Sequence, residues 1–299
     1  MSPVHDDVAA FRVESARYGA SLTRALPHLP VGTYEVLDAG AGAPVRELMV
    51  YRPAGVAGPP PVLVNLHGGG FVLGEGRDDD PYCRFLADAA GCAVVNVDYL
   101  LAPEHPFPAA VHQVHGLLAW LAEHAGAHGL DGTRLAVAGH SAGGNLAAAA
   151  ALLARRSGGP SLRGVVVDYA PLDLATPPAA KLTTAPDPGA VALADAGARF
   201  NAWYLADADP ADELASPLLA DDLSGLPPTL VLTAELDLLR AEGDRFAERL
   251  AEAGVPVEHV VHAGCGHAFT HVGPDDEAAA AWERIARFAR RVLVDEAGA

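Results

Sequence analysis

The sequence predicts an α/β fold in which one mostly parallel sheet carries helices on both faces. Two observations lead to this prediction. Short runs rich in Val and Leu alternate along the chain with longer segments of helical periodicity. Most of the short runs are apolar at consecutive positions, which is typical of strands buried on both faces. With 299 residues, 51% of them hydrophobic, the chain can bury a large core, and we expect a single domain spanning residues 1–299.

Eight strands and five following helices make up the expected order of elements. The strands are expected at 33–38, 45–52, 61–67, 92–98, 134–139, 163–168, 228–234 and 256–262. Helical patterns lie at 80–90, 109–125, 142–156, 239–253 and 277–293. No helical pattern separates the first two strands, so we expect them to pair antiparallel at one edge of the sheet.

Two segments fall outside this alternation and predict a small helical cap. Residues 8–26 read as an amphipathic helix. The connection after the strand at 163–168 is roughly 60 residues long, a length that is usually functional or disordered. It contains the aromatic cluster Phe200, Trp203 and Tyr204, which favours an ordered lid. We therefore expect a cap built from residues 1–30 and about 175–215, over the edge where the strands end.

The charge and hydropathy of the chain restrict its partners. Asp and Glu outnumber Lys and Arg by 38 to 20, giving a formal charge of −18. Such a surface repels nucleic acid, anionic membranes and polyanionic substrates, whereas neutral or cationic small molecules are compatible with it. The apolar run Leu146–Ala154 is too short to span a bilayer. We expect a cytoplasmic protein, a monomer or a homodimer, with its three cysteines reduced.

The stretch GHSAGGN at 139–145 places Ser141 between a strand and a helix. Small residues on both sides of Ser141 allow the chain to reverse sharply and present the serine hydroxyl at the apex of the turn. In a parallel sheet, this position lies at the carboxyl edge, where ligands bind. Ser141 is therefore a candidate nucleophile. The alternative is that it only caps the helix.

The stretch HGGGF at 67–71 ends another strand. Successive glycines let backbone N–H groups approach a ligand without interference from a Cβ atom. Preorganised N–H donors of this kind stabilise the oxyanion that develops in acyl transfer. We assign the donors to Gly69, Gly70 and Ala142, whereas the alternative interpretation of the glycine run is a flexible turn.

A serine nucleophile needs a base and an orienting carboxylate, which follow it in the order acid, then histidine, in this kind of fold. Asp237 follows the strand at 228–234, and His267 follows the strand at 256–262 within a loop that contains Gly264 and Gly266. Both therefore belong to the same sheet edge as Ser141. The competing groups are Glu235, Asp244, His262 and His271.

Other titratable groups are assigned no catalytic or metal-binding role. Side chains of adjacent residues diverge at a tight turn, so His140 is expected to pack or form hydrogen bonds and not to activate Ser141. The pairs His112/His115 and His124/His128 have helical spacing but lack a local third ligand. The run Asp78–Asp80 reads as a helix start, and no nucleotide-binding motif is present. No metal or cofactor is expected.

The sequence resembles the hormone-sensitive-lipase-like family of α/β-hydrolases from about residue 33 to its end. The shared stretches are HGGGF at 67–71, DYLLAPEHPFPAA at 98–110, GHSAGGN at 139–145, ASPLLADDLSGLPPTLVLTAELDLLRAEG at 215–243 and the loop of His267. The resemblance implies the α/β-hydrolase fold with a small cap and carboxylesterase activity on short- to medium-chain esters. It also implies a triad of Ser141, Asp237 and His267, with an oxyanion hole from Gly69, Gly70 and Ala142.

Four residues depart from the family pattern. His140 replaces the usual Asp before the nucleophile, and Leu100 replaces an Arg. Leu238 follows the acid where Pro is usual, and Ala268 follows the histidine where Gly is frequent. None of these replaces a catalytic group, so they bear on the tuning of the triad and on substrate preference.

The leading functional hypothesis is a serine carboxylesterase acting on short- to medium-chain or compact esters through an acyl-enzyme. The residues expected to line its substrate pocket are Phe71, Phe200, Trp203, Tyr204 and Cys265, with simple packing as the alternative for Cys265. Two other functions stay open. One is an amide or lactone hydrolase or an acyltransferase in small-molecule biosynthesis, and the other is a non-catalytic ligand-binding relative.

Overall fold

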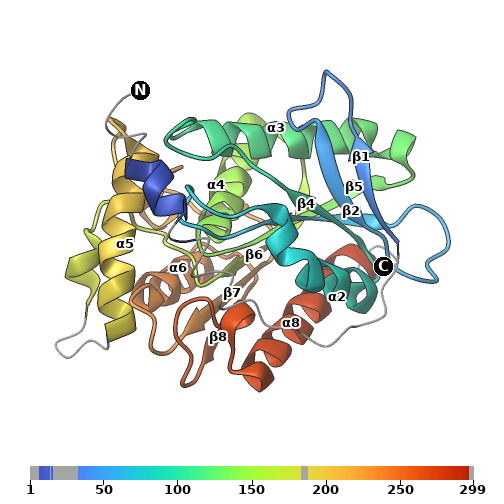
Figure 1. Cartoon of the computed structure of the whole chain (residues 1–299). Helices are drawn as coiled ribbons and strands as arrows, with labels where there is room; N and C mark the ends of the chain where they lie inside the picture. Colours follow the sequence, from blue (N-terminus) through green and yellow to red (C-terminus); the bar gives the residue numbers. More distant parts are fainter. Residues whose placement is uncertain (1–6, 14, 16–32, 183–187, 296–299) are drawn as a thin grey trace.

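The computed structural model describes residues 7–13, 15, 33–182 and 188–295. Within them, eight strands form one sheet in the order β1-β2-β4-β3-β5-β6-β7-β8 (Figure 1). The strands are β1 (Tyr34–Asp38), β2 (Glu47–Tyr51), β3 (Pro61–Leu66), β4 (Ala93–Val97), β5 (Asp131–His140), β6 (Leu162–Asp168), β7 (Thr229–Ala234) and β8 (Val257–His262). Strand β3 pairs parallel with β4 and β5, and parallel pairing continues through β8.

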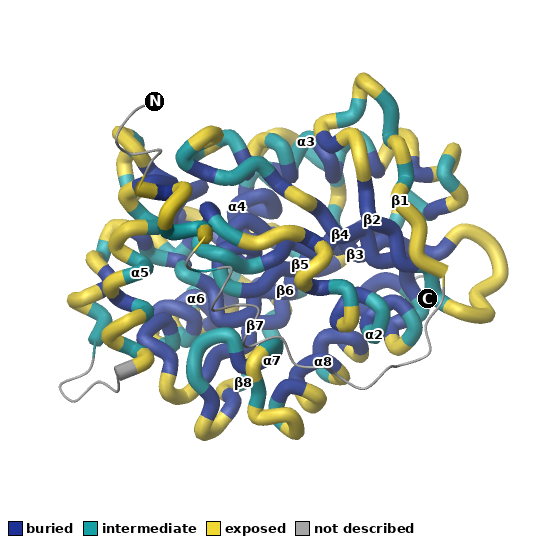
Figure 2. The backbone as a smooth tube through the Cα atoms, viewed as in Figure 1, coloured by how far each residue is buried: buried dark blue, intermediate teal, exposed yellow. Residues whose placement is uncertain are grey.

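The antiparallel edge is also where the sequence predicts it. β1 pairs antiparallel with β2, and β2 is in turn antiparallel to β4. Strands β3, β4 and β7 are buried at every position, whereas β1 is mostly exposed (Figure 2). The prediction of an eight-stranded, mostly parallel sheet is confirmed. The largest error in a strand start is at β5, which begins at Asp131 and not at residue 134.

Helices cover both faces of the sheet. They are α2 (Asp80–Ala90), α3 (Ala109–His124), α4 (Ala142–Ser157), α5 (Pro188–Leu205), α6 (Arg240–Glu252), α7 (Phe269–Val272) and α8 (Asp275–Arg290). Val62 and Val64 of β3 join the core formed with α3, α4 and α6, whereas Leu63 points to the opposite side and joins the core formed with α2 and α8. Alternate residues of a strand face opposite ways, which is why β3 is apolar throughout. No helix in the described ranges is both long and apolar enough to cross a membrane.

A helical segment near the start of the chain packs against α5 (Figure 1). Residues 7–13 and 15 are helical, and the remainder of the helix expected at 8–26 lies outside the described residues. The Phe11 ring centroid lies 5.6 Å from that of Phe200 and 5.4 Å from that of Trp203. The guanidinium of Arg199 lies 4.5 Å from the centre of the Phe11 ring. An ordered helix thus occupies part of the long connection after β6.

A buried ion pair fastens the beginning of this connection to α6. Lys181, at the end of the 3₁₀ turn Pro178–Lys181, pairs with Glu242 of α6, and both side chains are less than 10% exposed. Glu242 Oε1 accepts the N–H of Leu172 at 2.7 Å, and Lys181 donates to the carbonyl of Asp173 at 2.6 Å. Burial raises the pKa of Glu242 to about 7, although the Lys181 ammonium opposes that rise.

Substitution of Lys181 tests how strongly this pair holds the segment. The pKa of Glu242 is higher in the folded protein than in the unfolded chain, so protonated Glu242 favours the folded state. This contribution to stability is fully present below the pKa that Glu242 has in the unfolded chain, and it is lost as the pH rises through about 7. Lys181→Met removes the ammonium and raises this pKa further. We expect a loss in the free energy of unfolding of about 3–5 kcal/mol at pH 8 and a smaller loss at pH 5, measured by urea denaturation.

Arg245→Met is the matched control, since it removes exposed ion pairs from α6, the helix that carries Glu242, and should leave the midpoint of urea denaturation almost unchanged. If Lys181→Met lost the same free energy of unfolding at pH 8 and at pH 5, the Lys181 ammonium would not be stabilising an ionised Glu242.

Candidate active site

The turn between β5 and α4 holds Ser141 in a strained backbone conformation. Its φ is 51° and its ψ is −123°, a positive-φ conformation that is rare for a residue other than glycine and concentrates at functional sites. The Ser141 N–H donates to the carbonyl of Asp168 at 2.8 Å, and the Ser141 carbonyl accepts the N–H of Gly144 at 2.9 Å. The serine therefore lies at the apex of a well-braced turn.

Two glycines make this turn sterically feasible. A Cβ atom at Gly139 would lie 2.2 Å from the backbone of Gly143, and one at Gly143 would lie 2.0 Å from the carbonyl oxygen of Leu66. The helix α4 can therefore begin directly against the ends of β3 and β5. Ala142, the first residue of α4, has no intrahelical acceptor for its N–H because a helix leaves its first N–H groups unpaired.

The structure brings Ser141, His267 and Asp237 together from the carboxyl ends of three strands. Ser141 Oγ lies 2.9 Å from His267 Nε2, and His267 Nδ1 lies 2.7 Å from Asp237 Oδ2. The other oxygen of Asp237 accepts the N–H of Leu239 at 3.0 Å. The Asp237 side chain is 1% exposed and that of His267 is 20% exposed. This arrangement can pass a hydroxyl proton to an imidazole that a buried carboxylate orients.

The competing acids and histidines have partners elsewhere. Of the two acids, Glu235 accepts the N–H of Gly264, and Asp244 contacts Thr233 and His259. Of the two histidines, His262 contacts Glu277 and His271 lies beside Asp79. Within the described part of the chain, none of these four side chains forms a hydrogen bond with Ser141, whose hydroxyl bonds to His267.

The glycine loop after β3 presents its backbone close to the turn of Ser141. Gly69 and Gly70 have φ of 114° and 60°, and a Cβ at Gly69 would lie 2.1 Å from the carbonyl oxygen of Leu73. Only glycine suits such a position. The Gly69 carbonyl accepts the N–H groups of Val72 and Leu73 at 3.1 and 2.8 Å. The N–H groups of Gly69 and Gly70 have no acceptor within the described part of the chain, so they remain available to a ligand.

Arg12 braces this loop from the segment at 7–13, a contact that sequence reasoning missed. Its guanidinium donates to the carbonyls of Val72 and Ala102 at 3.0 and 2.8 Å. It also forms a bidentate pair with Glu104 at 2.7 and 2.8 Å. An arginine in an amphipathic helix gives no signal that distinguishes it from a solvated charge, so this role depends on the tertiary structure.

The residues expected to line the pocket occupy different environments. The Phe200 ring lies so close to Gly70 that a Cβ on Gly70 would be 2.3 Å from it. Phe71 and Tyr204 stack at a centroid distance of 3.8 Å and are both buried. Trp203 packs against Phe11. Cys265 is fully buried in the core shared with α2 and α8, away from these aromatics, so the structure places it in packing.

His140 points away from the serine hydroxyl, as the sequence predicts. Its Nε2 lies 3.0 Å from Asp79 Oδ2 and accepts the N–H of Gly68 at 3.2 Å. Burial lowers the pKa of His140 to about 4. The run Asp78–Asp80 lies at the start of α2, as the sequence predicts, with Asp79 as the N-cap residue and Asp80 in the first turn, although the Asp79 side chain forms no hydrogen bond to a helix N–H. Its carboxylate is instead buried beside His140 and Asn65.

The other three family departures also have identifiable surroundings. Leu238 is buried in a small cluster with Ala194 of α5, so the residue after the acid contacts the connection after β6. Ala268 has φ of 64°, a left-handed conformation that favours glycine. The N–H of Leu100 donates to Gln113 at 2.7 Å.

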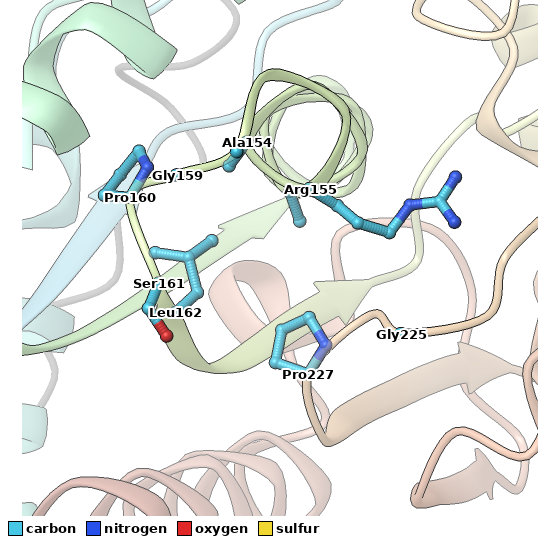
Figure 3. Close-up of a pocket in the computed structure, with 10 residues that line it drawn as sticks. Ala154, Arg155, Gly159, Pro160, Ser161, Leu162, Gly225 and Pro227 are labelled. Atoms are coloured by element: carbon cyan, nitrogen blue, oxygen red, sulfur yellow. The ribbon is translucent and has the colours of Figure 1, made fainter.

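A pocket of about 280 Å³ lies at the opposite end of the sheet (Figure 3). It is formed where α4 ends and β6 begins, and includes Arg155, Pro160 and Ser161. The Arg155 guanidinium is already bound by Asp222 and the carbonyl of Ser224. None of the three residues of the triad lines this pocket, so it is separate from the candidate active site.

Comparisons with known proteins agree with this geometry. A family profile described as the α/β hydrolase fold matches residues 63–271. Carboxylesterase NlhH of Mycobacterium tuberculosis is 42% identical over 240 residues, which cover 78% of this chain and 73% of that protein. Esterase LipI of the same organism is 41% identical over 217 residues, covering 70% and 67%. A solved hyperthermophilic esterase from Pyrobaculum calidifontis has a TM-score of 0.81 at 35% identity, covering 96% of this chain and 94% of its own.

Gly143→Ala tests the steric basis of the Ser141 turn. The new methyl group would meet the backbone of Leu66, which cannot rotate away, so we expect a loss of about 3 kcal/mol in the free energy of unfolding. Gly126→Ala is the control, because a Cβ there meets nothing within 4 Å and should shift stability by less than about 1 kcal/mol. Urea denaturation measures both, and similar midpoints for the two variants would refute the close packing of the turn.

Proposed function

Because this chain belongs to the α/β-hydrolase family, among its hormone-sensitive-lipase-like members, and is a carboxylesterase, we propose that it hydrolyses compact carboxylic esters through an acyl-enzyme on Ser141. The observation that carries this assignment is the hydrogen-bonded series Ser141–His267–Asp237, with distances of 2.9 and 2.7 Å. The three residues lie at the ends of β5, β7 and β8, where an open parallel sheet binds its ligands.

In the acylation step, Ser141 Oγ attacks the ester carbonyl carbon while His267 Nε2 takes the hydroxyl proton. Asp237, buried and hydrogen-bonded to His267 Nδ1, orients the imidazole and stabilises its protonated form. When the tetrahedral intermediate collapses, the bond to the alkoxy oxygen breaks. His267 transfers its proton to that oxygen, and the alcohol leaves.

In the deacylation step, water repeats this sequence on the acyl-enzyme. His267 accepts a proton from the water as it attacks the acyl carbon, and then returns a proton to Ser141 Oγ. The carboxylic acid departs and the serine is regenerated. No redox or metal chemistry enters these steps, because the nucleophile, base and acid all come from the chain.

We assign the oxyanion hole to the N–H groups of Gly69, Gly70 and Ala142. The N–H groups of the two loop glycines have no acceptor among the described residues, and Ala142 begins the helix α4 that follows Ser141. Each donor aimed at the developing oxyanion is worth roughly 10²–10³ in kcat in comparable sites. Arg12 and Glu104 support this assignment indirectly, because they fix the segment that continues the glycine loop.

We assign a cap to the helical segment at 7–13 together with α5. Both pack on the side of the glycine loop, through Arg12 to Val72 and through Phe200 to Gly70. The ring of Phe200 restricts the space beside the oxyanion hole, which favours a short acyl chain or a compact ester. The formal charge of −18 favours neutral or cationic esters over anionic ones.

Ser141→Ala tests the nucleophile. We expect kcat on p-nitrophenyl acetate and butyrate to fall by about 10⁴–10⁶-fold, because the covalent step is lost while binding remains. Ser161→Ala is the matched control, since Ser161 is an exposed serine far from the triad. Release of p-nitrophenol measures both. Retained activity in Ser141→Ala would exclude Ser141 as the nucleophile, and product transfer to an added alcohol in preference to water would reassign the enzyme as an acyltransferase.

Phe200→Ala tests the limit on acyl length. Removing the ring beside Gly70 should raise the ratio of kcat/KM for octanoate to that for acetate by roughly tenfold, the scale on which added hydrophobic space discriminates substrates. Phe85→Ala is the control, because Phe85 packs against Trp282 in the other core. An unchanged ratio for Phe200→Ala would place the acyl chain elsewhere.

A further inference from the structure

Three titratable side chains from distant parts of the chain meet behind the catalytic turn. Asp79 precedes α2, His140 ends β5 and His271 belongs to α7. One ligand atom from each lies within 4.8 Å of the others. The imidazole rings of His140 and His271 stack on one another, with ring centroids 4.1 Å apart and an interplanar angle of 28°. We call these three residues the His–Asp–His cluster. The proposed esterase mechanism uses none of them.

The spacing of the donor atoms suits a small metal ion. Asp79 Oδ1 lies 3.1 Å from His140 Nε2 and 3.3 Å from His271 Nε2. Zinc binds imidazole nitrogen and carboxylate oxygen at about 2.0–2.2 Å in tetrahedral geometry, which separates neighbouring ligand atoms by roughly 3.3 Å. The two carboxylate–imidazole distances of the cluster are therefore close to those that a shared ion requires.

The charge of the cluster also calls for a cation. The Asp79 side chain is 2% exposed, and the only ion pairs it makes within the described residues are with the two histidines. An isolated buried carboxylate is strongly disfavoured unless it is paired or coordinates a metal. Asn65 donates to Asp79 Oδ2 at 2.7 Å, which orients the carboxylate so that Oδ1 lies near both imidazoles while Oδ2 also lies 3.0 Å from His140 Nε2.

The histidines are held as metal ligands usually are. His271 Nδ1 lies 2.9 Å from Thr270 Oγ1 and 3.1 Å from the Tyr169 hydroxyl, whereas its buried Nε2 has no hydrogen-bond partner among the described residues. Metal-binding histidines typically use the second ring nitrogen for such an outer contact. His140 Nε2 lies 3.0 Å from Asp79 Oδ2 and 3.2 Å from the Gly68 nitrogen, so an ion bound there would take the one Nε2 lone pair in place of the Gly68 N–H.

We infer that Asp79, His140 and His271 form a binding site for a divalent transition-metal ion, with Zn²⁺ as the best match to two imidazoles and one carboxylate. The ion would join the start of α2, the turn of the nucleophile and the helix that follows the catalytic histidine. The Tyr169 ring, 5.1 Å from His267 and 6.0 Å from His140 by centroid, separates the site from the triad. The site is therefore structural, and its existence does not depend on the proposed esterase mechanism.

Zinc binding to the untagged full chain tests the site. After treatment with a chelator and dialysis, titration calorimetry with ZnCl₂ should give one ion per chain, and bound Zn²⁺ should raise the Tm. His271→Gln should weaken binding by more than the roughly 10–100-fold that loss of an outer contact alone produces, and should abolish the rise in Tm. The site is partly open at His271, whose side chain is 22% exposed, so this variant is the one best suited to folding.

His259→Gln is the matched control, because His259 pairs with Asp244 at 3.0 Å but has no second histidine in its site. It should bind Zn²⁺ as the wild type does. Asp79→Asn, which keeps the side-chain shape, provides a second test if His271→Gln loses its native circular dichroism spectrum. Absence of stoichiometric binding by the wild type, or equal affinity in the wild type, His271→Gln and Asp79→Asn, would overturn the proposal.

Discussion

The positive-φ turn at Ser141 is the constraint on which the active site depends. The turn exists because Gly139 and Gly143 let β5 and α4 meet at a distance that any Cβ atom would prevent. The same contact presses α4 against the carbonyl of Leu66 at the end of β3, and so fixes the nucleophile relative to the glycine loop that follows β3. One steric condition therefore sets three features together: the position of the serine hydroxyl, the start of α4 at Ala142 and the position of Gly69 and Gly70.

The parallel sheet explains how residues so distant in sequence converge. Successive parallel strands all end at one edge, so the loops after β3, β5, β7 and β8 deliver the glycine loop, the serine, the acid and the histidine to one place. Asp168 and Tyr169 reach the same edge from β6, where Asp168 receives the Ser141 N–H. Neither residue was singled out from the sequence, although the rule that located the triad applies equally to the end of this strand.

The surroundings of the triad are fastened by contacts between segments. Arg12 joins the segment at 7–13 to the carbonyls of Val72 and Ala102, Phe200 covers Gly70, and Leu238 contacts α5 directly after Asp237 in the chain. Two of the residues that depart from the family pattern, Leu238 and His140, take part in contacts around the triad residues. Leu238 adds an apolar contact to α5, and His140 replaces a carboxylate with an imidazole that faces Asp79 and His271.

The sequence alone predicted the sheet, its antiparallel edge and most of the helices, and it singled out the three residues that meet as the candidate triad, because these features depend on hydrophobic periodicity and on short motifs that are local in the chain. It did not determine which side chains surround that framework. The position of Cys265 in the core, the bracing by Arg12 and the meeting of Asp79 with His140 and His271 join segments that no local pattern connects. Only the tertiary structure decides such contacts, since they depend on how helices and loops pack across the sheet.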